Sequence, residues 1–160
     1  NLVEKLLENA QGYCKTCGIE MGPVKPLVFE ITERQAIQNL DTLEQDLKYL
    51  LDFGFRLALD DFGSGLSSFT YLKNMPVDYL KIDGSFVRDM VDDPMDAAMV
   101  ASINQVGHVM GLKTIAEFVE TDEVLEKLRE MGVDFAQGYG IERPKPLEDL
   151  IAAQQEVLAL

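Results

Sequence analysis

The chain has 160 residues, is 47% apolar and carries a formal net charge of −14. This length and composition are sufficient for one folded domain with a substantial core. The negative charge excludes a partner held by broad basic electrostatics, such as duplex nucleic acid, although metal ions can reverse the local field for a phosphate ligand. No apolar run is long enough to span a bilayer, so we expect a cytoplasmic domain whose parent protein could still be anchored to the inner membrane.

Short apolar runs alternate with amphipathic segments along the chain. A helix is expected from Leu2 to about Asn9, and another from Pro146 to the end. Between them, five runs have the length and near-continuous hydrophobicity of parallel strands covered on both faces: residues 27–31, 56–60, 78–82, 113–117 and 134–138. Capping residues predict three intervening helices, which start at Asp41, Asp93-Pro94 and Thr121 and stop at Gly54, Gly111 and Gly132.

The polar residues at the strand ends favour a barrel over an open doubly wound sheet. Each expected strand carries a polar or charged residue near its C-terminal end, whereas an open sheet gathers such residues near one switch point. A (β/α)₈ barrel needs about 250 residues, so five strand-helix units indicate an N-terminally truncated barrel. An unusually small open sheet is the alternative. With no repeat or linker, residues 1–160 are expected to form a single domain.

Acidic side chains at several strand ends point to a metal centre. The polar strand-end residues are Glu30, Glu33, Asp60, Asp61, Lys81, Asp83, Glu117, Glu120 and Gln137. Carboxylates that converge from three strands repel one another unless cations bind them, and oxygen ligands suit Mg²⁺ or Mn²⁺. Two such ions, about 3.5–4 Å apart, could activate water and stabilise charge in phosphodiester hydrolysis.

Several of these polar strand-end residues also have a purely structural interpretation. Glu33 and Glu120 could serve solely as helix caps. Asp83 could serve solely to begin a turn, and Gln137 could serve solely in packing. Lys81 has apolar neighbours on both sides, and a strand lysine there is costly without a partner. We therefore expect Lys81 to meet the carboxylate cluster or a phosphate.

Three other patterns carry weaker signals. The segment Gly63, Ser64, Gly65 does not complete a dinucleotide fingerprint, and we interpret residues 61–68 as a flexible functional loop over the metals or at a dimer contact. Cys14 and Cys17 form a lone C-x-x-C that predicts structural or incidental thiols. His108 lies in a helix pattern and is expected to pack or face solvent.

The ordered strand-end motifs resemble the EAL family of cyclic-di-GMP phosphodiesterases. The matching stretches run in order from about Leu27 to Pro146: Glu30-Ile31-Thr32-Glu33, Asp60-Asp61-Phe62-Gly63-Ser64-Gly65, Leu80-Lys81-Ile82-Asp83, Ala116-Glu117-Phe118-Val119-Glu120 and Gln137-Gly138-Tyr139. The resemblance implies an EAL-type modified (β/α)₈ TIM barrel with about the last five β/α units present. The Glu-Ala-Leu segment itself is absent, and Phe118 and Leu66 replace the usual glycine and tyrosine.

The resemblance also implies roles for individual residues. Glu30, Asp60, Asp61 and Glu117 resemble the metal ligands, with two Mg²⁺ or Mn²⁺ ions as cofactors. Glu117 is also placed with the catalytic residues, together with Lys81, which resembles the residue that holds the attacking water or a phosphate oxygen, and Glu33, which resembles the acid that steadies the 61–68 loop. Glu120, Gln137 and Arg143 occupy rim positions, where Arg143 could reach the nucleotide or form a salt bridge.

The function implied is metal-dependent hydrolysis of cyclic-di-GMP to linear pGpG in bacterial signalling. The alternatives are a catalytically inactive cyclic-di-GMP receptor and a regulatory dimerisation module. A homodimer and upstream GGDEF or sensory domains in a parent protein are expected as partners. The 160-residue chain alone is expected to hydrolyse very slowly or not at all, because the name-giving glutamate lies outside it.

Overall fold

The computed structural model describes residues 28–38, 47–48, 50–63, 69–146 and 149. Several sequence-based expectations fall outside these residues. They concern the two terminal helices, the helix start at Asp41, the cysteines Cys14 and Cys17, and the loop residues Ser64 and Gly65.

Five parallel strands form one sheet in the order in which they occur in the chain. They are β1 (Val28–Thr32), β2 (Arg56–Phe62), β3 (Tyr79–Ile82), β4 (Lys113–Ala116) and β5 (Phe135–Ala136). Each new strand is added to the same edge of the sheet, so within the described residues the strand order never reverses as it does in a doubly wound sheet. The order is that of a barrel wall, and the expected α/β partial barrel is confirmed.

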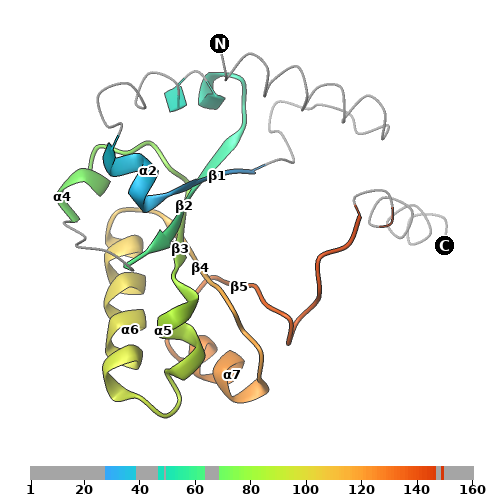
Figure 1. Cartoon of the computed structure of the whole chain (residues 1–160). Coiled ribbons are helices and arrows are strands. Elements are labelled where there is room, and N and C mark those ends of the chain that lie inside the picture. Colours follow the sequence, from blue (N-terminus) through green and yellow to red (C-terminus); the bar gives the residue numbers. More distant parts are fainter. Residues whose placement is uncertain (1–27, 39–46, 49, 64–68, 147–148, 150–160) are drawn as a thin grey trace.

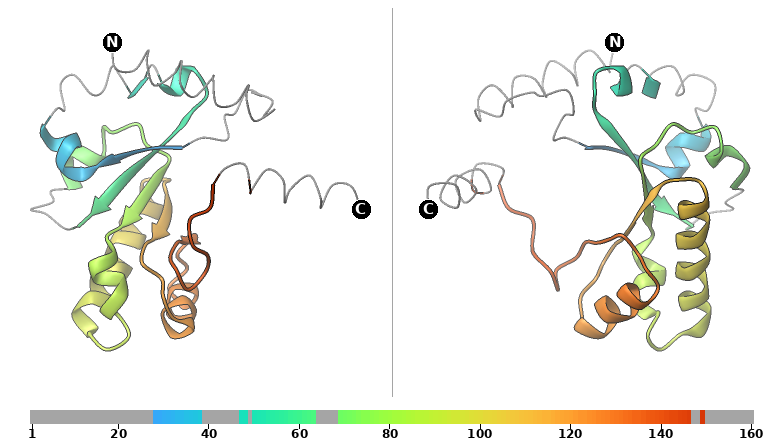
Figure 2. Two further views of the ribbon diagram at one scale, coloured as in Figure 1. Left: turned by 45° about the vertical axis from the view of Figure 1, so that its right-hand side comes forward. Right: turned by 180° about the vertical axis from the view of Figure 1, so that it is seen from behind.

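Helices cover one side of this wall (Figures 1 and 2). They are α2 (Glu33–Gln38), α4 (Phe69–Leu72), α5 (Gly84–Asp89), α6 (Pro94–Val109) and α7 (Asp122–Glu130). The predicted starts of the last two are confirmed, because Asp93 caps α6 through the Met95 N–H and Thr121 caps α7 through the Val124 N–H. None of the described helices is long and apolar enough to cross a membrane.

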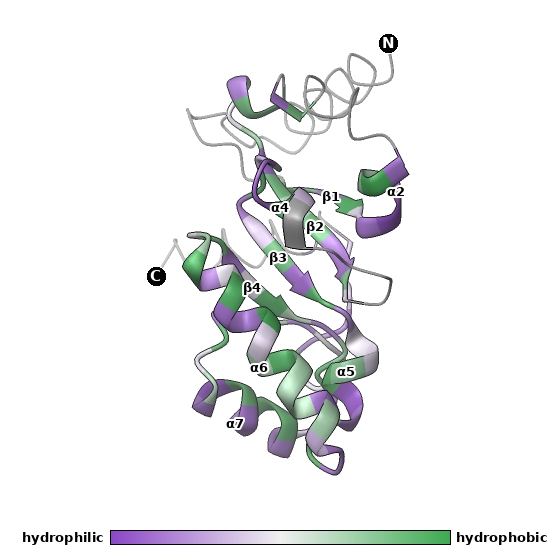
Figure 3. Ribbon diagram, turned by 90° about the vertical axis from the view of Figure 1, so that its left-hand side faces the viewer, coloured by the Kyte–Doolittle hydropathy of each residue, from purple (hydrophilic) through white to green (hydrophobic). Residues whose placement is uncertain are grey.

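The core lies between the strands and the helices. Leu80 and Ile82 of β3 are fully buried and belong to one apolar cluster with Val100 and Ile103 of α6. Because side chains alternate along a strand, Tyr79 and Lys81 face the opposite side of the sheet. Purple bands near the arrowheads of β2 and β3 in Figure 3 mark the polar ends of these strands.

The side of the sheet that faces away from the helices is only partly covered by the described residues. Val28 is 43% exposed and Phe135 is 50% exposed, and the Phe135 ring meets the Tyr79 ring edge-on with centroids 6.1 Å apart. In a closed barrel this face lines the interior and is filled by side chains from all strands. The acidic strand ends lie at the C-terminal edge of this same face.

A polar network joins the N-terminal ends of β4 and β5. Asp134 accepts hydrogen bonds from Lys113 Nζ at 2.6 Å and from the Thr114 N–H at 3.0 Å, and it lies 2.7 Å from His108 Nε2. The Thr114 hydroxyl lies 2.6 Å from Asn104 of α6. The network ties two strands to a helix at the end of the sheet opposite the acids, where barrel residues contribute to stability.

A similar arrangement occurs two strands earlier. Asp78, just before β3, accepts a hydrogen bond of 2.9 Å from the Leu57 N–H of β2. Asp78 lies in the segment Met75-Pro76-Val77-Asp78-Tyr79, and Asp134 lies in the matching segment Met131-Gly132-Val133-Asp134-Phe135. Both aspartates bind a backbone N–H of the preceding strand, so the short sequence match reflects a shared structural task.

We predict that Asp134→Asn lowers the free energy of unfolding by about 2 kcal/mol at neutral pH. Burial alone would raise the pKa of Asp134, but the contacts from Lys113, Thr114 and His108 hold it well below its ordinary value of 3.8. A lowered carboxyl pKa stabilises the fold above about pH 4, and this stabilisation is lost as the pH falls further. Urea unfolding at neutral and acidic pH measures the effect. The exposed Asp92→Asn is the control, and a loss that stays the same at all pH values would contradict the prediction.

Candidate metal centre

A bulge in β2 brings two adjacent aspartates to the same rim. Successive side chains of a regular strand point to opposite faces, so Asp60 and Asp61 would normally diverge. Here Leu59 pairs with Leu80 while Phe62 pairs with Ile82, which leaves one extra residue in β2. Asp61 also adopts a left-handed conformation with φ of 56°, which aspartate tolerates better than most residues. The bulge and this turn direct both carboxylates into one site.

Lys81 lies at the centre of the acidic strand ends. Its Nζ is 2.8 Å from Glu30 Oε2 of β1, 2.8 Å from Asp60 Oδ1 of β2 and 2.9 Å from Glu117 Oε1 beyond β4. The lysine side chain is only 3% exposed. Three strands therefore contribute one acid each around a cation from β3, which sits between them in the sheet.

The electrostatics of the site reflect this crowding. Burial raises the pKa of Glu117, and the charges of Asp60 and Asp61 raise it further against the opposing effect of Lys81. The pKa of Asp61 is raised by burial and by the charges of Asp60 and Asp83. Burial lowers the pKa of Lys81, but its contacts with the acids outweigh burial and raise it overall. The acids are thus short of positive charge even with Lys81 in place.

The donor set fits a divalent cation. Carboxylate oxygens of Asp60, Asp61 and Glu117 lie within 4.8 Å of one another. Two oxygens on opposite sides of one Mg²⁺ are about 4.2 Å apart, so a small contraction would complete such a site. Asp60 Oδ1 is buried and, apart from its ion pair with the Lys81 ammonium at 2.8 Å, has no hydrogen-bond partner among the described residues. An oxygen in that state is suited to a metal ligand.

Glu33 contacts residues on both sides of the segment 64–68. Its side chain is buried at the start of α2 and accepts a hydrogen bond of 3.2 Å from the Gly63 N–H. The Tyr71 hydroxyl donates to its other oxygen at 2.5 Å. Burial and this hydrogen bond raise the pKa of Tyr71, so the phenol stays protonated. Gly63 precedes residues 64–68 and Tyr71 follows them, so one carboxylate fixes both flanks of the loop.

Phe118 follows Glu117 directly and adopts a left-handed conformation with φ of 53°. This conformation is unfavourable for a bulky residue. The ring lies against Gly84 at the start of α5, where a Cβ atom would overlap with it, and the Arg88 guanidinium stands 5.5 Å from its centroid. The close contact with Gly84 and Arg88 compensates part of the backbone strain beside the metal centre.

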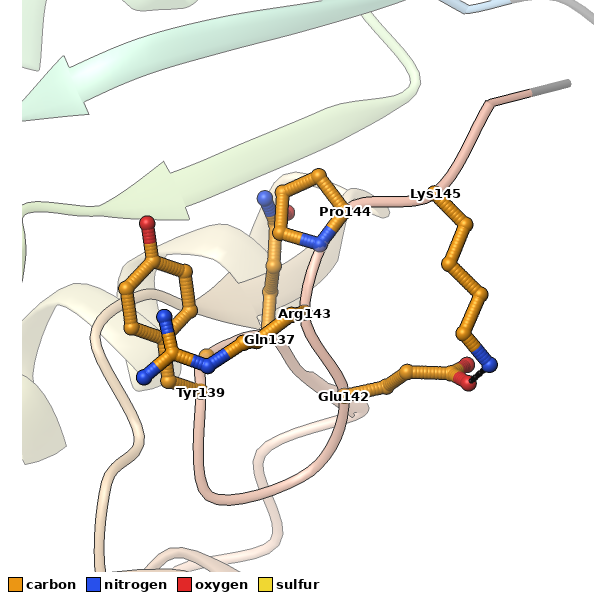
Figure 4. Close-up of a pocket in the computed structure, with 7 residues that line it drawn as sticks. Gln137, Tyr139, Glu142, Arg143, Pro144 and Lys145 are labelled. Carbon is orange, nitrogen blue, oxygen red and sulfur yellow. Dashed lines mark hydrogen bonds and ion pairs between the residues drawn. The ribbon is translucent and has the colours of Figure 1, made fainter.

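Two hollows lie beside the cluster, after β4 and β5. The smaller, of about 160 Å³, is lined by Glu117, Phe118, Glu120, Gln137, Gly138 and Tyr139. The larger, of about 320 Å³, shares Gln137 and Tyr139 and extends to Arg143 and Lys145 (Figure 4). The Arg143 guanidinium stacks over the Tyr139 ring at 4.3 Å, and Lys145 pairs with Glu142.

The predicted site residues therefore fall into three groups. Glu30, Asp60 and Glu117 each form an ion pair with Lys81, and Asp61 joins Asp60 and Glu117 in a trio of nearby carboxylate oxygens that does not include Glu30. Glu33 is beside the loop, while Glu120, Gln137 and Arg143 line the adjacent hollows. Asp83 caps α5 through the Ser85 N–H. Tyr71 was missed by sequence reasoning, because a tyrosine in a short helix carries no periodic signal of its partner.

The fold and the site together define a parallel barrel wall with a cluster of acids at its strand ends that could hold a metal ion. Comparison with known proteins identifies the family. The family model described as the EAL domain matches residues 10–144, and the chain belongs to the EAL domain family.

Named relatives and solved structures agree with this assignment. The cyclic di-GMP phosphodiesterase PdeB of Shewanella oneidensis is 50% identical over 125 residues, which are 78% of this chain and 15% of PdeB. The bifunctional diguanylate cyclase/cyclic di-GMP phosphodiesterase MucR of Pseudomonas aeruginosa is 39% identical over 127 residues, which are 79% of this chain and 18% of MucR. The chain therefore spans less than a fifth of the length of these two relatives.

This chain covers a larger share of several solved structures than of the two relatives. The PaMucR phosphodiesterase in its c-di-GMP complex superposes with a TM-score of 0.72 at 40% identity, covering 78% of this chain and 50% of that one. BlrP1 of Klebsiella pneumoniae, in a calcium/cy-diGMP complex, has a TM-score of 0.76 at 32% identity, covering 89% and 34%. A manganese/cy-diGMP complex of BlrP1 gives 0.66 at 35% identity, covering 70% and 29%.

We predict that Gly84→Ala destabilises the chain by about 2 kcal/mol, because the added methyl group displaces the Phe118 ring. In the Phe118→Gly background the same change should cost little, since the obstructing ring is gone. Urea unfolding of both single variants and the double variant gives the coupling. Additive losses would show that the Phe118 ring does not rest on Gly84.

Proposed function

We propose that the chain forms the C-terminal part of an EAL domain that hydrolyses cyclic di-GMP to linear pGpG with Mg²⁺ or Mn²⁺. The observation that carries the proposal is the cluster of carboxylates from Glu30, Asp60, Asp61 and Glu117 around the buried Lys81. In addition, this chain is 50% identical over 125 residues to the cyclic di-GMP phosphodiesterase PdeB. The calcium and manganese complexes of BlrP1 support a divalent cation here, and two ions would suit four acids.

The site residues would have three separate roles in this reaction. Glu30, Asp60, Asp61 and Glu117 would hold the divalent cations, which when bound would supply polarisation of the phosphoryl group and favour ionisation of the attacking water. Lys81 would donate a hydrogen bond to that water or to a phosphate oxygen. Glu33 would keep the 61–68 loop in place through Gly63 and Tyr71.

The rim supplies groups that suit a nucleotide. Arg143 and the Tyr139 ring offer positive charge and a stacking surface, and Gln137 and Glu120 offer hydrogen-bonding groups on adjacent walls. We assign these four residues to substrate contacts beside the metal centre. The overall charge of −14 makes such local positive groups necessary for an anionic substrate.

The parent protein is proposed to carry further domains. MucR is named as a bifunctional diguanylate cyclase and phosphodiesterase, which supports a GGDEF or sensory domain upstream of this chain. Homodimerisation through the region of the 61–68 loop stays a prediction. Sedimentation of the parent protein with and without cyclic di-GMP would test it.

We predict hydrolysis when the missing part of the barrel is supplied. In a chimera, residues 28–144 would replace the matching segment of the MucR phosphodiesterase. With Mn²⁺ it should convert cyclic di-GMP to pGpG, and Glu117→Gln should slow this by about 100-fold. The 160-residue chain alone should show little or no turnover. A folded chimera that binds cyclic di-GMP without forming pGpG would favour the receptor alternative and contradict the proposal.

We also predict that Asp61→Asn weakens Mn²⁺ binding by the 160-residue chain about tenfold or more. The amide keeps the shape of the side chain but removes the charge that attracts the cation. Isothermal titration with Mn²⁺ measures the change. Glu126→Gln, an exposed acid on α7, should leave the affinity unchanged, and equal effects of the two variants would reject the assigned site.

A further inference from the structure

Lys81 makes more contacts with acids than a substrate-binding lysine requires. Its Nζ lies within 2.9 Å of three carboxylates from three different strands, and its side chain is 3% exposed. An ammonium has three N–H donors. Here it donates a hydrogen bond of 2.8 Å to Glu30 and forms close ion pairs with Asp60 and Glu117. A lysine kept ready for a phosphate would instead be expected to keep a donor turned towards the solvent.

The acids that Lys81 contacts are largely those that form the oxygen trio. Asp60 and Glu117 belong to both sets, and the buried Asp60 Oδ1 is the very atom that faces Lys81 at 2.8 Å. An ammonium and a divalent cation cannot both approach these oxygens closely without strong mutual repulsion. The two cations therefore compete for the same ligands.

We propose that Lys81 is the resident cation of this cluster, which holds Glu30, Asp60 and Glu117 together in the metal-free protein and is displaced from Asp60 and Glu117 when a divalent ion binds. This inference rests on the metal centre of the proposed function. Lys81 would thus act as a positioning residue for the ligands before it serves the substrate. Displacement from Asp60 and Glu117 would leave its ammonium free to turn a donor towards a phosphate oxygen.

This exchange has two consequences for the energetics. Without Lys81, the crowded and partly buried carboxylates of Asp60 and Glu117 would repel each other uncompensated, which destabilises the metal-free fold. With Lys81, part of the free energy of metal binding is consumed by breaking ion pairs. Removal of the ammonium should therefore weaken the metal-free protein and strengthen its affinity for the metal at the same time, whereas a lysine that assists the metal would give the opposite affinity change.

The variant Lys81→Met tests this prediction, because it keeps the apolar stem and removes the charge. We expect its Mn²⁺ dissociation constant to fall about tenfold at low ionic strength, which corresponds to about 1.4 kcal/mol. Its thermal midpoint should fall in EDTA and recover most of the loss in saturating Mn²⁺. Lys113→Met is the matched control, since Lys113 pairs with Asp134 at the other end of the sheet. The control should lose the same stability with and without Mn²⁺.

A second measurement uses the native chain and does not depend on a variant that folds poorly. The ammonium signal of Lys81 in an NMR spectrum of ¹⁵N-lysine-labelled protein is assigned by its loss in Lys81→Arg. Titration with diamagnetic Mg²⁺ should shift or broaden this signal in step with binding, while the Lys113 signal stays in place. A Lys81 signal that does not change at saturating Mg²⁺, or an unchanged or weaker Mn²⁺ affinity of Lys81→Met, would overturn the inference. Neither readout involves cyclic di-GMP, so a failure to hydrolyse it would be a separate result.

Discussion

A buried ammonium among converging carboxylates is the interaction on which the arrangement of this sheet depends. Isolated charges are costly to bury, and an unpaired Lys81 in the middle of β3 would oppose folding. The cost is offset only when β1, β2 and the end of β4 bring their acids to the same height in the sheet. The parallel register of these strands and the ion pairs at their ends therefore support each other. A slip of one residue would turn Lys81 towards the apolar helices.

The rim stores backbone strain close to this charge. Asp61 and Phe118 are the non-glycine residues with positive φ among the described part of the chain, and each adjoins an acid of the cluster. Neither conformation is favourable in isolation. They persist because neighbouring groups determine them, through the bulge in β2 and through the contact of the Phe118 ring with Gly84. Local strain at the functional edge is thus held by packing that lies just outside it.

The strands and helix starts could be predicted because they depend on local patterns. The apolar runs located all five strands to within a few residues, and Asp93 and Thr121 act as the expected caps. The convergence of Lys81 with the acids followed from the general property that parallel strands end at one edge. The β2 bulge and the partner of Glu33 did not follow, because both depend on pairing between segments far apart in the chain. The shared task of Asp78 and Asp134 was also missed, because the likeness of their segments spans only five residues and does not amount to a repeat.

The two ends of the sheet divide stability and function between them. At the N-terminal end, Asp134 is surrounded by Lys113, Thr114 and His108, so its charge is well compensated and contributes to the fold. At the C-terminal end, four acids share one lysine, and the pKa values of Asp61 and Glu117 are raised rather than lowered. The same residue type is therefore satisfied at one end and left short of positive charge at the other. That imbalance would favour a divalent cation at this end, because added positive charge relieves it without rearranging the sheet.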